Sequence, residues 1–377
     1  MKCVHEFRIS VDEEQISDLK RRLRETRYVP NPHNKDEEEG VSVSEQRRFI
    51  DYWRDSYDWK AAEKRINDSM PQFIAEDVQG ESIHFVWRHS PENREVILLC
   101  HGWPGSFIEF ERVMDLIDSS FDLVIPSMPG YGFSSYRTDR AINLSTIGDI
   151  YHELMTGLGY DRYYVQGGDW GAHVASWMAY HYPKHVKAFH LNFLPGSYMP
   201  DDTMRQFTLS EKKYFDEMAE FRKDGIGYDE IQATRPLTLA AALNDSPAGM
   251  AIWLYEKFRS WSDRENSLGI TLTDDRILDD ISIYWFTQTI YSSCRLYQEA
   301  LCSKLRFAEG ERIIPPMGFT AFPAEFAIPP RELLERVYNV RYYNVAKAGG
   351  HFAAMEQPEI LASEINSFFC NMQKVSQ

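Results

Sequence analysis

Residues 164–175 read YVQGGDWGAHVA, and they carry the strongest indication of the fold. A short apolar run leads into the pattern small–x–acid–x–small, which is centred on Asp169, and a helical pattern follows. Such a strand-to-helix turn is a nucleophile elbow, in which the central residue sits on a strained turn. Gly167 and Gly171 suit this turn because it packs closely on its neighbours. The usual central residue is serine, so the sequence predicts an enzyme that attacks with an aspartate instead.

The regions on both sides of the elbow alternate between strand and helix patterns. Several strand patterns are continuous apolar runs, as expected of parallel strands that are covered on both faces. The predicted strands are residues 73–74, 83–87, 96–100, 123–125, 163–165, 186–193, 313–314 and 341–345. This alternation predicts an α/β fold with an open, mostly parallel central sheet and helices on both faces.

Helical patterns occupy the remaining parts of the chain. Residues 1–70 are predicted to form a helical extension packed on the core, and the first 60 residues are expected to lie outside the sheet. Its first helix is expected to begin with a capping box formed by Ser10 and Glu13. Residues 195–300 are helical and rich in aromatic residues, and their position between two strands predicts a cap. The sheet domain then comprises residues 71–194 and 301–377.

Composition and charge exclude several classes of partner. The chain of 377 residues is 43% hydrophobic and 14% aromatic, which suffices for a large core and an apolar pocket. The formal net charge of −16 argues against binding to nucleic acid or to an anionic membrane surface. The five cysteines are scattered and never spaced CxxC, so we interpret them as reduced thiols. The first residues, MKCVHEFRISVDEEQ, lack the apolar stretch of a signal peptide or membrane anchor, and a soluble cytoplasmic protein is expected.

The segment HGWPGS directly follows the predicted strand at residues 96–100. In a fold with this elbow, the loop at that position contributes one backbone N–H to an oxyanion hole, and the residue after the nucleophile contributes the other. We therefore assign the N–H groups of Trp103 and Trp170 to the oxyanion hole. A cis peptide bond before the proline is one way to fix this loop. The supporting loop residues are His101, Gly102 and Pro104.

A general base and its orienting acid are expected near the end of the chain. His351 follows the last predicted strand, and an imidazole suits the task because its pKa near 6.5 leaves it largely neutral at working pH. The chain order nucleophile, acid, histidine favours Glu325 as the partner and disfavours Glu356 and Glu359, which come after the histidine. His173 lies within the helix after the elbow and is expected to be packed rather than catalytic.

Taken together, the motifs HGWPGS, GGDWG, GFTAFPAE and AGGHFAAMEQPE resemble those of the microsomal-type epoxide hydrolase family, within the α/β-hydrolase superfamily. The segments FRISVDEEQISDLKRRL and ALNDSPAGMAIWLYEKF are similar to the same family, so the likeness spans nearly the whole chain. Because the membrane-bound members carry an N-terminal anchor that is not seen here, the likeness is to the soluble branch.

The resemblance implies an α/β-hydrolase fold with a helical cap, and it supports Asp169, Glu325 and His351 as a catalytic triad. It also implies two cap tyrosines that hold the epoxide oxygen. Tyr297, in SSCRLYQE, matches one of them closely. Tyr228, in GYDEIQ, matches the other through a looser motif. A phenol suits this role because it donates a hydrogen bond to the ring oxygen and can transfer a proton as the alkoxide develops.

The sequence therefore predicts an enzyme that converts an apolar epoxide to a vicinal diol, with water as co-substrate and without metal or organic cofactor. One alternative is a haloalkane dehalogenase, which shares the aspartate nucleophile. The tyrosine pair and the N-terminal extension of this chain favour the epoxide hydrolase instead. A second is a non-catalytic ligand-binding protein on the same fold, which is disfavoured because the triad is retained. The sequence leaves open a detoxifying or a dedicated biosynthetic role, and a monomeric or homodimeric state.

Overall fold

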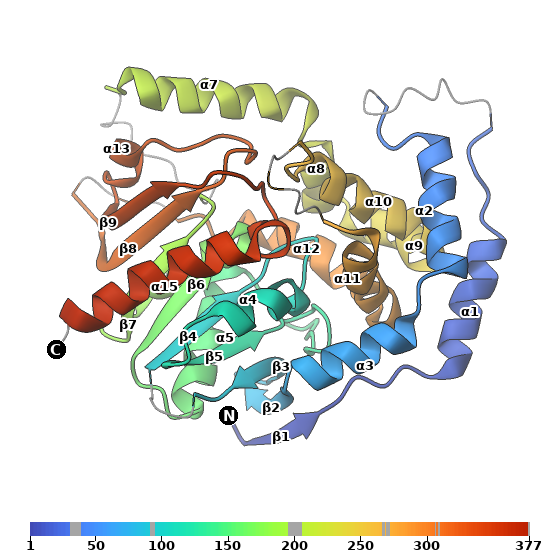
Figure 1. The fold of residues 1–377 in the computed structure, drawn as a ribbon, viewed down its shortest axis with the longest axis horizontal. Helices are drawn as coiled ribbons and strands as arrows, with labels where there is room; N and C mark the ends of the chain where they lie inside the picture. Colours follow the sequence, from blue (N-terminus) through green and yellow to red (C-terminus); the bar gives the residue numbers. More distant parts are fainter. Residues whose placement is uncertain are drawn as a thin grey trace.

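The computed structural model describes residues 1–30, 39–90, 95–194, 206–265, 268, 272–305, 307 and 310–375 of the chain. These residues form one nine-stranded sheet with the order β1-β2-β3-β5-β4-β6-β7-β8-β9 (Figure 1). The strands are β1 (Cys3–Phe7), β2 (Gln72–Val78), β3 (Glu81–Arg88), β4 (Glu95–Cys100), β5 (Phe121–Pro126), β6 (Tyr163–Gly167), β7 (Val186–Leu191), β8 (Ile313–Ala321) and β9 (Tyr338–Val345). The neighbouring strands from β5 to β9 are parallel, whereas β1, β2 and β3 join by antiparallel pairing. The predicted mostly parallel sheet is confirmed.

Helices cover the sheet because its central strands are apolar on both faces. All six residues of β5 are buried, as are five of the six in β4. Helix α4 packs against α15, which crosses in front of the sheet in Figure 1, and α5 packs against α6. The helices and short turns of the sheet domain are η1 (Phe107–Phe110), α4 (Glu111–Leu116), α5 (Leu144–Gly157), α6 (Asp169–His181), α13 (Arg331–Leu334), α14 (Ala353–Glu356) and α15 (Pro358–Val375).

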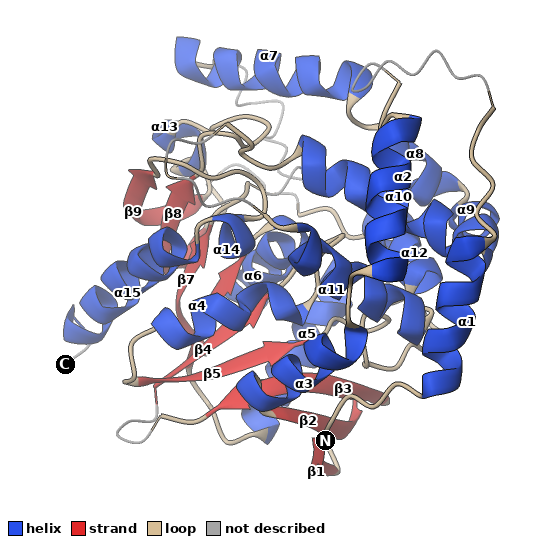
Figure 2. Ribbon diagram, turned by 45° about the vertical axis from the view of Figure 1, so that its right-hand side comes forward, coloured by secondary structure: helices blue, strands red, loops and turns tan. Residues whose placement is uncertain are grey.

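A helical insertion separates β7 from β8, as the sequence predicted. Its described helices are α7 (Leu209–Asp224), α8 (Gly227–Thr234), α9 (Pro236–Asp245), α10 (Pro247–Ser260), α11 (Asp274–Thr287) and α12 (Ile290–Ala300). Helix α7 stands apart from the others along the top of both ribbon views, and in Figure 1 it lies above β8 and β9 (Figures 1 and 2). It is attached there by the stacked rings of Phe221 and Phe326, whose centroids lie 4.1 Å apart. The predicted start of the cap at residue 195 lies outside the described residues.

The prediction that the first 60 residues lie outside the sheet is wrong. Strand β1 pairs antiparallel with β2, and Phe7 packs its ring 5.0 Å from that of Phe133. The strand is a five-residue edge strand in which only Val4 and Phe7 are half-buried. Such a short strand lacks the alternation of apolar and polar residues that identifies strands in a sequence.

The first helix begins later than predicted. Helix α1 (Glu13–Arg24) follows Asp12, whose backbone N–H donates to the side chain of Gln15 at 3.2 Å, so Ser10 and Glu13 do not form the capping box. The residues before Asp12 are held outside the helix by contacts that are distant in sequence. In particular, the N–H of Val11 donates to the buried carboxylate of Glu63 at 2.7 Å.

The N-terminal helices connect the insertion to the sheet domain. Helix α2 (Val43–Asp55) contacts α10, where the rings of Phe49 and Tyr255 stack with centroids 3.8 Å apart. Helix α3 (Trp59–Ser69) contacts α11. Between α3 and α11, Arg65 Nη2 lies 2.5 Å from Asp279 Oδ2, and its Nε lies 3.1 Å from the Glu111 carboxylate on α4. One guanidinium group thus ties together three parts of the molecule.

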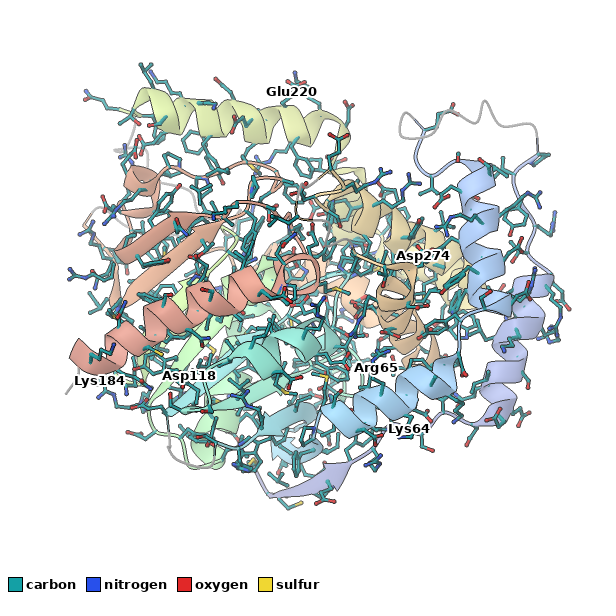
Figure 3. All side chains as sticks on the ribbon, viewed as in Figure 1. Lys64, Arg65, Asp118, Lys184, Glu220 and Asp274 are labelled. Carbon is teal, nitrogen blue, oxygen red and sulfur yellow. The ribbon has the colours of Figure 1, made fainter. Side chains whose placement is uncertain are left out.

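We predict that Arg65→Ala lowers the free energy of unfolding by about 2 kcal/mol, because it leaves the buried carboxylates of Asp279 and Glu111 short of a positive partner. The expected loss is smaller than for a fully buried pair because the Arg65 side chain is 38% exposed and partly screened by water. Lys64, its neighbour on α3 (Figure 3), pairs with exposed Asp68. We expect Lys64→Ala to cause no measurable change in the free energy of unfolding. Urea unfolding compares the two variants, and equal losses would contradict this account.

Candidate active site

The nucleophile elbow predicted from the sequence lies between β6 and α6. Asp169, the first residue of α6, has a backbone φ of 45°, in the left-handed region that few non-glycine residues adopt. A Cβ atom on Gly167 would lie 2.2 Å from the carbonyl oxygen of Gly171, and one on Gly171 would lie 2.0 Å from the carbonyl oxygen of Cys100. Both positions therefore exclude a side chain, and the tight turn holds Asp169 at the end of β6.

The loop after β4 brings backbone N–H groups to the Asp169 carboxylate. The N–H of Trp103 donates to Oδ1 at 2.8 Å, and the N–H of Trp170 hydrogen-bonds to the same carboxylate. A Cβ atom on Gly102 would lie 2.4 Å from the Cβ of Asp169, so glycine allows this close approach. The two N–H groups assigned from the sequence both contact the carboxylate, and their role as an oxyanion hole stays a prediction.

His101 holds this loop in place through two hydrogen bonds of its imidazole ring. Its Nε2 accepts the N–H of Met128 at 3.0 Å, and its Nδ1 donates to the carbonyl oxygen of Gly102 at 3.0 Å. Burial lowers the pKa of His101 to about 4, so the ring is neutral and can accept on one nitrogen while donating from the other. The peptide bond between Trp103 and Pro104 is cis.

His351 lies between two carboxylates that come from distant parts of the chain. Its Nε2 is 3.2 Å from Asp169 Oδ2, and its Nδ1 is 3.0 Å from each carboxylate oxygen of Glu325. Glu325 follows β8, and its Oε1 also accepts the N–H of Phe326 at 3.0 Å. The structure thus brings together the three side chains that the sequence order singled out as a triad.

Burial and charge act in opposite directions on these groups. Burial alone would lower the pKa of His351, but the carboxylates of Glu325 and Asp169 outweigh it and raise that pKa above its ordinary value of 6.5. Burial would raise the pKa of Asp169, but His351 and the N–H groups of Trp103 and Trp170 hold it below its ordinary value. The expectation of a largely neutral imidazole is therefore wrong for the free protein, which at neutral pH holds an imidazolium ion between two carboxylates.

Two tyrosines of the insertion face this trio. The ring of Tyr228, on α8, stacks parallel to the indole of Trp103 with centroids 5.4 Å apart. The ring of Tyr297, on α12, meets the indole of Trp170 edge-on at 4.7 Å, and the two tyrosine rings are 5.8 Å apart. Burial is the main cause that raises the pKa of both phenols far above the ordinary value, and the negative charge of Asp169 adds to it. Both phenols are therefore protonated and able to donate a hydrogen bond.

Aromatic rings also surround the imidazole. Trp261, at the end of α10, lies with its ring centroid 5.1 Å from that of His351, and the ring of Phe326 stacks on His351 at 5.0 Å. Phe193 contacts the same imidazole edge-on at 5.5 Å. The site is thus a group of charged and phenolic side chains within a largely apolar enclosure.

The histidine loop is held by contacts that were not predicted from the sequence. The N–H of His351 donates to the carbonyl oxygen of Trp261 at 2.9 Å, and the N–H of Gly349 donates to Asp263 Oδ2 at 2.8 Å. Buried Glu356 accepts backbone N–H groups from Asp263 and Gly350, at 2.7 and 3.1 Å. These contacts join the insertion to the loop and could not be read from the sequence, because only the fold brings residues 261–263 beside residues 349–356.

The residues that the sequence analysis disfavoured lie away from the imidazole nitrogens. Glu356 also accepts the N–H of Phe352 at 2.9 Å, and burial raises its pKa to about 7 although these N–H groups oppose that change. Glu359 is exposed and pairs with Arg112 at 2.7 Å. His173 is buried with its ring 5.1 Å from that of Trp170, and burial lowers its pKa to about 4.

The sheet order, the elbow and the insertion after β7 define an α/β-hydrolase, and a model of the alpha/beta hydrolase fold matches residues 95–223. A second model, described as the epoxide hydrolase N terminus, matches residues 4–110. The chain belongs to the epoxide hydrolase family, as the motifs predicted.

Curated relatives and solved structures agree with this assignment. A putative epoxide hydrolase of Stigmatella aurantiaca is 37% identical over 96% of this chain and 84% of the relative, and epoxide hydrolase 1 of Oryctolagus cuniculus is 33% identical over 97% and 89%. The crystal structure of juvenile hormone epoxide hydrolase from Bombyx mori superposes with a TM-score of 0.87 at 29% identity, covering 100% of this chain and 96% of that one. The structure of Aspergillus niger epoxide hydrolase gives a TM-score of 0.87 at 30% identity, with coverages of 98% and 97%.

Two further properties concern the described residues as a whole. None of their helices combines the length and the apolar composition that crossing a bilayer requires. Among the same residues, His, Cys, Asp and Glu side chains do not gather in groups of three or more that could hold a metal ion.

We predict that Glu325→Gln lowers the pKa of His351 by about two pH units, because it removes one of the two carboxylates that raise it. An NMR titration of the imidazole measures this pKa. Glu359→Gln, which removes an exposed carboxylate that does not contact the ring, is the control and is expected to leave the pKa unchanged. An unchanged pKa in Glu325→Gln would contradict the assignment of Glu325.

The same variant should show a pH-dependent loss of stability. Because the pKa of His351 is raised in the folded state, its ion pairs stabilise the fold fully below the unfolded pKa of 6.5, and this contribution is lost as the pH rises through the folded pKa. The free energy of unfolding of Glu325→Gln should therefore fall further below that of the wild type at about pH 6 than at about pH 9.

Proposed function

We propose that the chain hydrolyses an epoxide to a vicinal diol through an ester formed on Asp169. The observation that carries this proposal is the environment of the Asp169 carboxylate. Oδ1 is engaged by the Trp103 N–H, whereas Oδ2 lies 3.2 Å from His351 Nε2, on the imidazole side of the carboxylate. A carboxylate held in this way can attack a saturated carbon that bears a leaving oxygen.

In the first step Asp169 Oδ2 attacks one epoxide carbon, and the bond from that carbon to the ring oxygen breaks. The phenols of Tyr228 and Tyr297 donate hydrogen bonds to the ring oxygen, and one of them transfers its proton to the alkoxide as it develops. Their raised pKa values keep both phenols protonated until that moment. The products of this step are an ester of Asp169 and a free hydroxyl on the neighbouring carbon.

Ester formation changes the electrostatics of the histidine. It removes the negative charge of Asp169, which is one of the two charges that raise the pKa of His351. The imidazolium therefore gives up its proton more readily in the ester than in the free protein, while Glu325 continues to orient the ring through Nδ1. This proton restores the phenol that the first step left deprotonated. This change makes His351 available as a general base only after the first step is complete.

In the second step His351 takes a proton from water as the water oxygen attacks Cγ of Asp169. The negative charge that develops on Oδ1 is stabilised by the N–H groups of Trp103 and Trp170. Collapse of this intermediate breaks the bond between Cγ and Oδ2, and the alkoxide leaves as the diol after taking the proton from His351. The proton that remains on the new carboxyl group of Asp169 then passes to the imidazole, which restores the ion pair of the free protein. The proton and charge balance closes with residues of this chain and water alone.

We further propose that residues 195–300 act as a cap and that residues 1–70 form an extension that holds this cap.

The proposed substrate is a largely apolar epoxide. The support for this substrate class is the aromatic enclosure: Trp103, Trp170 and Trp261 all contact the tyrosines or the histidine. Such an enclosure favours apolar substituents and excludes bulk water from the ester.

A second candidate function is haloalkane dehalogenation. The indole N–H groups of Trp103 and Trp170 are buried and have no hydrogen-bond partner among the described residues, so they could donate to a departing halide. The two phenols favour the epoxide instead, because a departing halide needs no proton whereas an opening epoxide oxygen does. Membership of the epoxide hydrolase family favours the same choice.

The test measures diol from a panel of aryl and alkyl epoxides and, in parallel, halide from haloalkanes. The wild type should form diol, and Asp169→Asn should lose at least ~10⁴-fold of this activity because the nucleophile is removed. Asp161→Asn changes an exposed aspartate before β6 and should retain full activity.

Halide release without diol would replace the proposal with the dehalogenase alternative. Tight binding of epoxides without either product would favour a non-catalytic ligand-binding protein. Among active outcomes, turnover of many epoxides would support a detoxifying role, and turnover of a single epoxide would support a dedicated biosynthetic one.

A further inference from the structure

A small cavity lies directly beside the Asp169 carboxylate, on the side of the sheet domain. Its volume is about 20 Å³, which is enough for one water molecule. Asp169 and His351 line it together with Gln166, Asn192 and Glu109. The mechanism above assigns no role to Glu109, although its carboxyl group borders the same space as the nucleophile and the base.

Glu109 belongs to η1, the short turn that follows the HGWPGS loop, and its carboxyl group is directed back toward that loop. A Cβ atom on Gly105 would lie only 2.6 Å from Glu109 Oε2. The backbone N–H of Glu109 donates to the carbonyl oxygen of Ser106 at 3.1 Å, but its carboxyl group makes no hydrogen bond to any described residue. A polar group in such a position is expected to bind water.

A second polar group on the cavity wall is also without a partner. Nε2 of Gln166 donates to Asn192 Oδ1 at 2.9 Å, but Gln166 Oε1 is buried and accepts no hydrogen bond from the described residues. A cavity lined by two such groups is polar, and polar cavities of this size hold water rather than remaining empty.

The loop directly before Glu109 is held by the insertion. Ser106 Oγ donates to Asp280 on α11 at 2.5 Å, and the hydroxyl of Tyr284, one turn further along α11, donates to the carbonyl oxygen of Gly105 at 2.9 Å. Burial, and after it the charges of Asp280 and Asp169, raises the pKa of Glu109 far above its ordinary value. This shift favours the neutral form of Glu109 over the ionised form, and its carboxyl group has an oxygen that accepts a hydrogen bond in either form.

We propose that Glu109 positions the water that hydrolyses the Asp169 ester. The water donates one hydrogen to His351 Nε2 and the other to the carboxyl group of Glu109, which directs an oxygen lone pair at Cγ of Asp169. During attack the water oxygen bonds to Cγ and its first hydrogen passes to His351, while Glu109 only accepts a hydrogen bond and transfers no proton. This inference rests on the proposed ester mechanism and concerns the second step alone.

The test separates the two steps in single-turnover experiments, with rapid quenching and intact-mass measurement of the ester on the protein. Glu109→Met has a side chain of similar size that cannot hold the water. It should form the ester within about threefold of the wild-type rate but hydrolyse it about 100-fold more slowly. Steady-state kcat and KM should then fall together, because the ester accumulates. Glu109→Gln keeps an acceptor and should hydrolyse the ester within about tenfold of the wild type.

Two further variants serve as controls. Asp115→Asn changes an exposed carboxylate on α4 and should alter neither step. His351→Gln removes the base and should trap the ester, which establishes that the assay detects it.

Gly105→Ala keeps Glu109 but forces its carboxyl group to move, and it should also slow ester hydrolysis selectively. If Glu109→Met does not fold, Gly105→Ala decides the question in the same assay.

The outcomes distinguish this inference from the proposed function. If neither the wild type nor His351→Gln forms an ester, the mechanism itself fails. If the wild type forms the ester and Glu109→Met hydrolyses it at the wild-type rate, Glu109 does not position the water. An equal slowing of both steps would likewise overturn the inference, because a purely structural role would produce it.

Discussion

The site depends on one constraint, which is the left-handed turn that holds the Asp169 carboxylate against the loop after β4. The turn can form because Gly167 and Gly171 have no Cβ atom, which at either position would overlap a neighbouring carbonyl group. It directs the carboxylate at the Trp103 N–H on one side and at the imidazole of His351 on the other. The same two contacts keep Asp169 ionised despite burial, so the geometry of the turn and the reactivity of the carboxylate have a common origin.

The insertion and the N-terminal helices keep these contacts in place from outside the sheet domain. Helix α11 is hydrogen-bonded to the HGWPGS loop through Asp280, and the end of α10 is hydrogen-bonded to the histidine loop through the carbonyl oxygen of Trp261. Arg65 in turn ties α11 to α3 and α4. The two loops that carry the site are thus each fixed by the elements that would enclose a substrate.

The sequence predicts those features that depend on residues close together in the chain. The elbow at Asp169 follows from the spacing of two glycines, and the strand patterns follow from continuous apolar runs. Glu325 and His351 followed from chain order combined with a motif, whereas the tyrosine pair followed only from the family resemblance. Strand β1 was missed because its pairing with β2 is a long-range contact, and Glu109 was missed because only the fold places its carboxyl group beside Asp169.

A covalent ester on Asp169 can be detected in one turnover in ¹⁸O-labelled water, with the protein in excess over an epoxide. If the ester forms, the diol carries unlabelled oxygen, because its new hydroxyl comes from the Asp169 carboxylate. In that case ¹⁸O appears in the proteolytic peptide that contains Asp169. Label in the diol from this first turnover, with an unlabelled peptide, would show direct attack of water on the epoxide and would contradict the account.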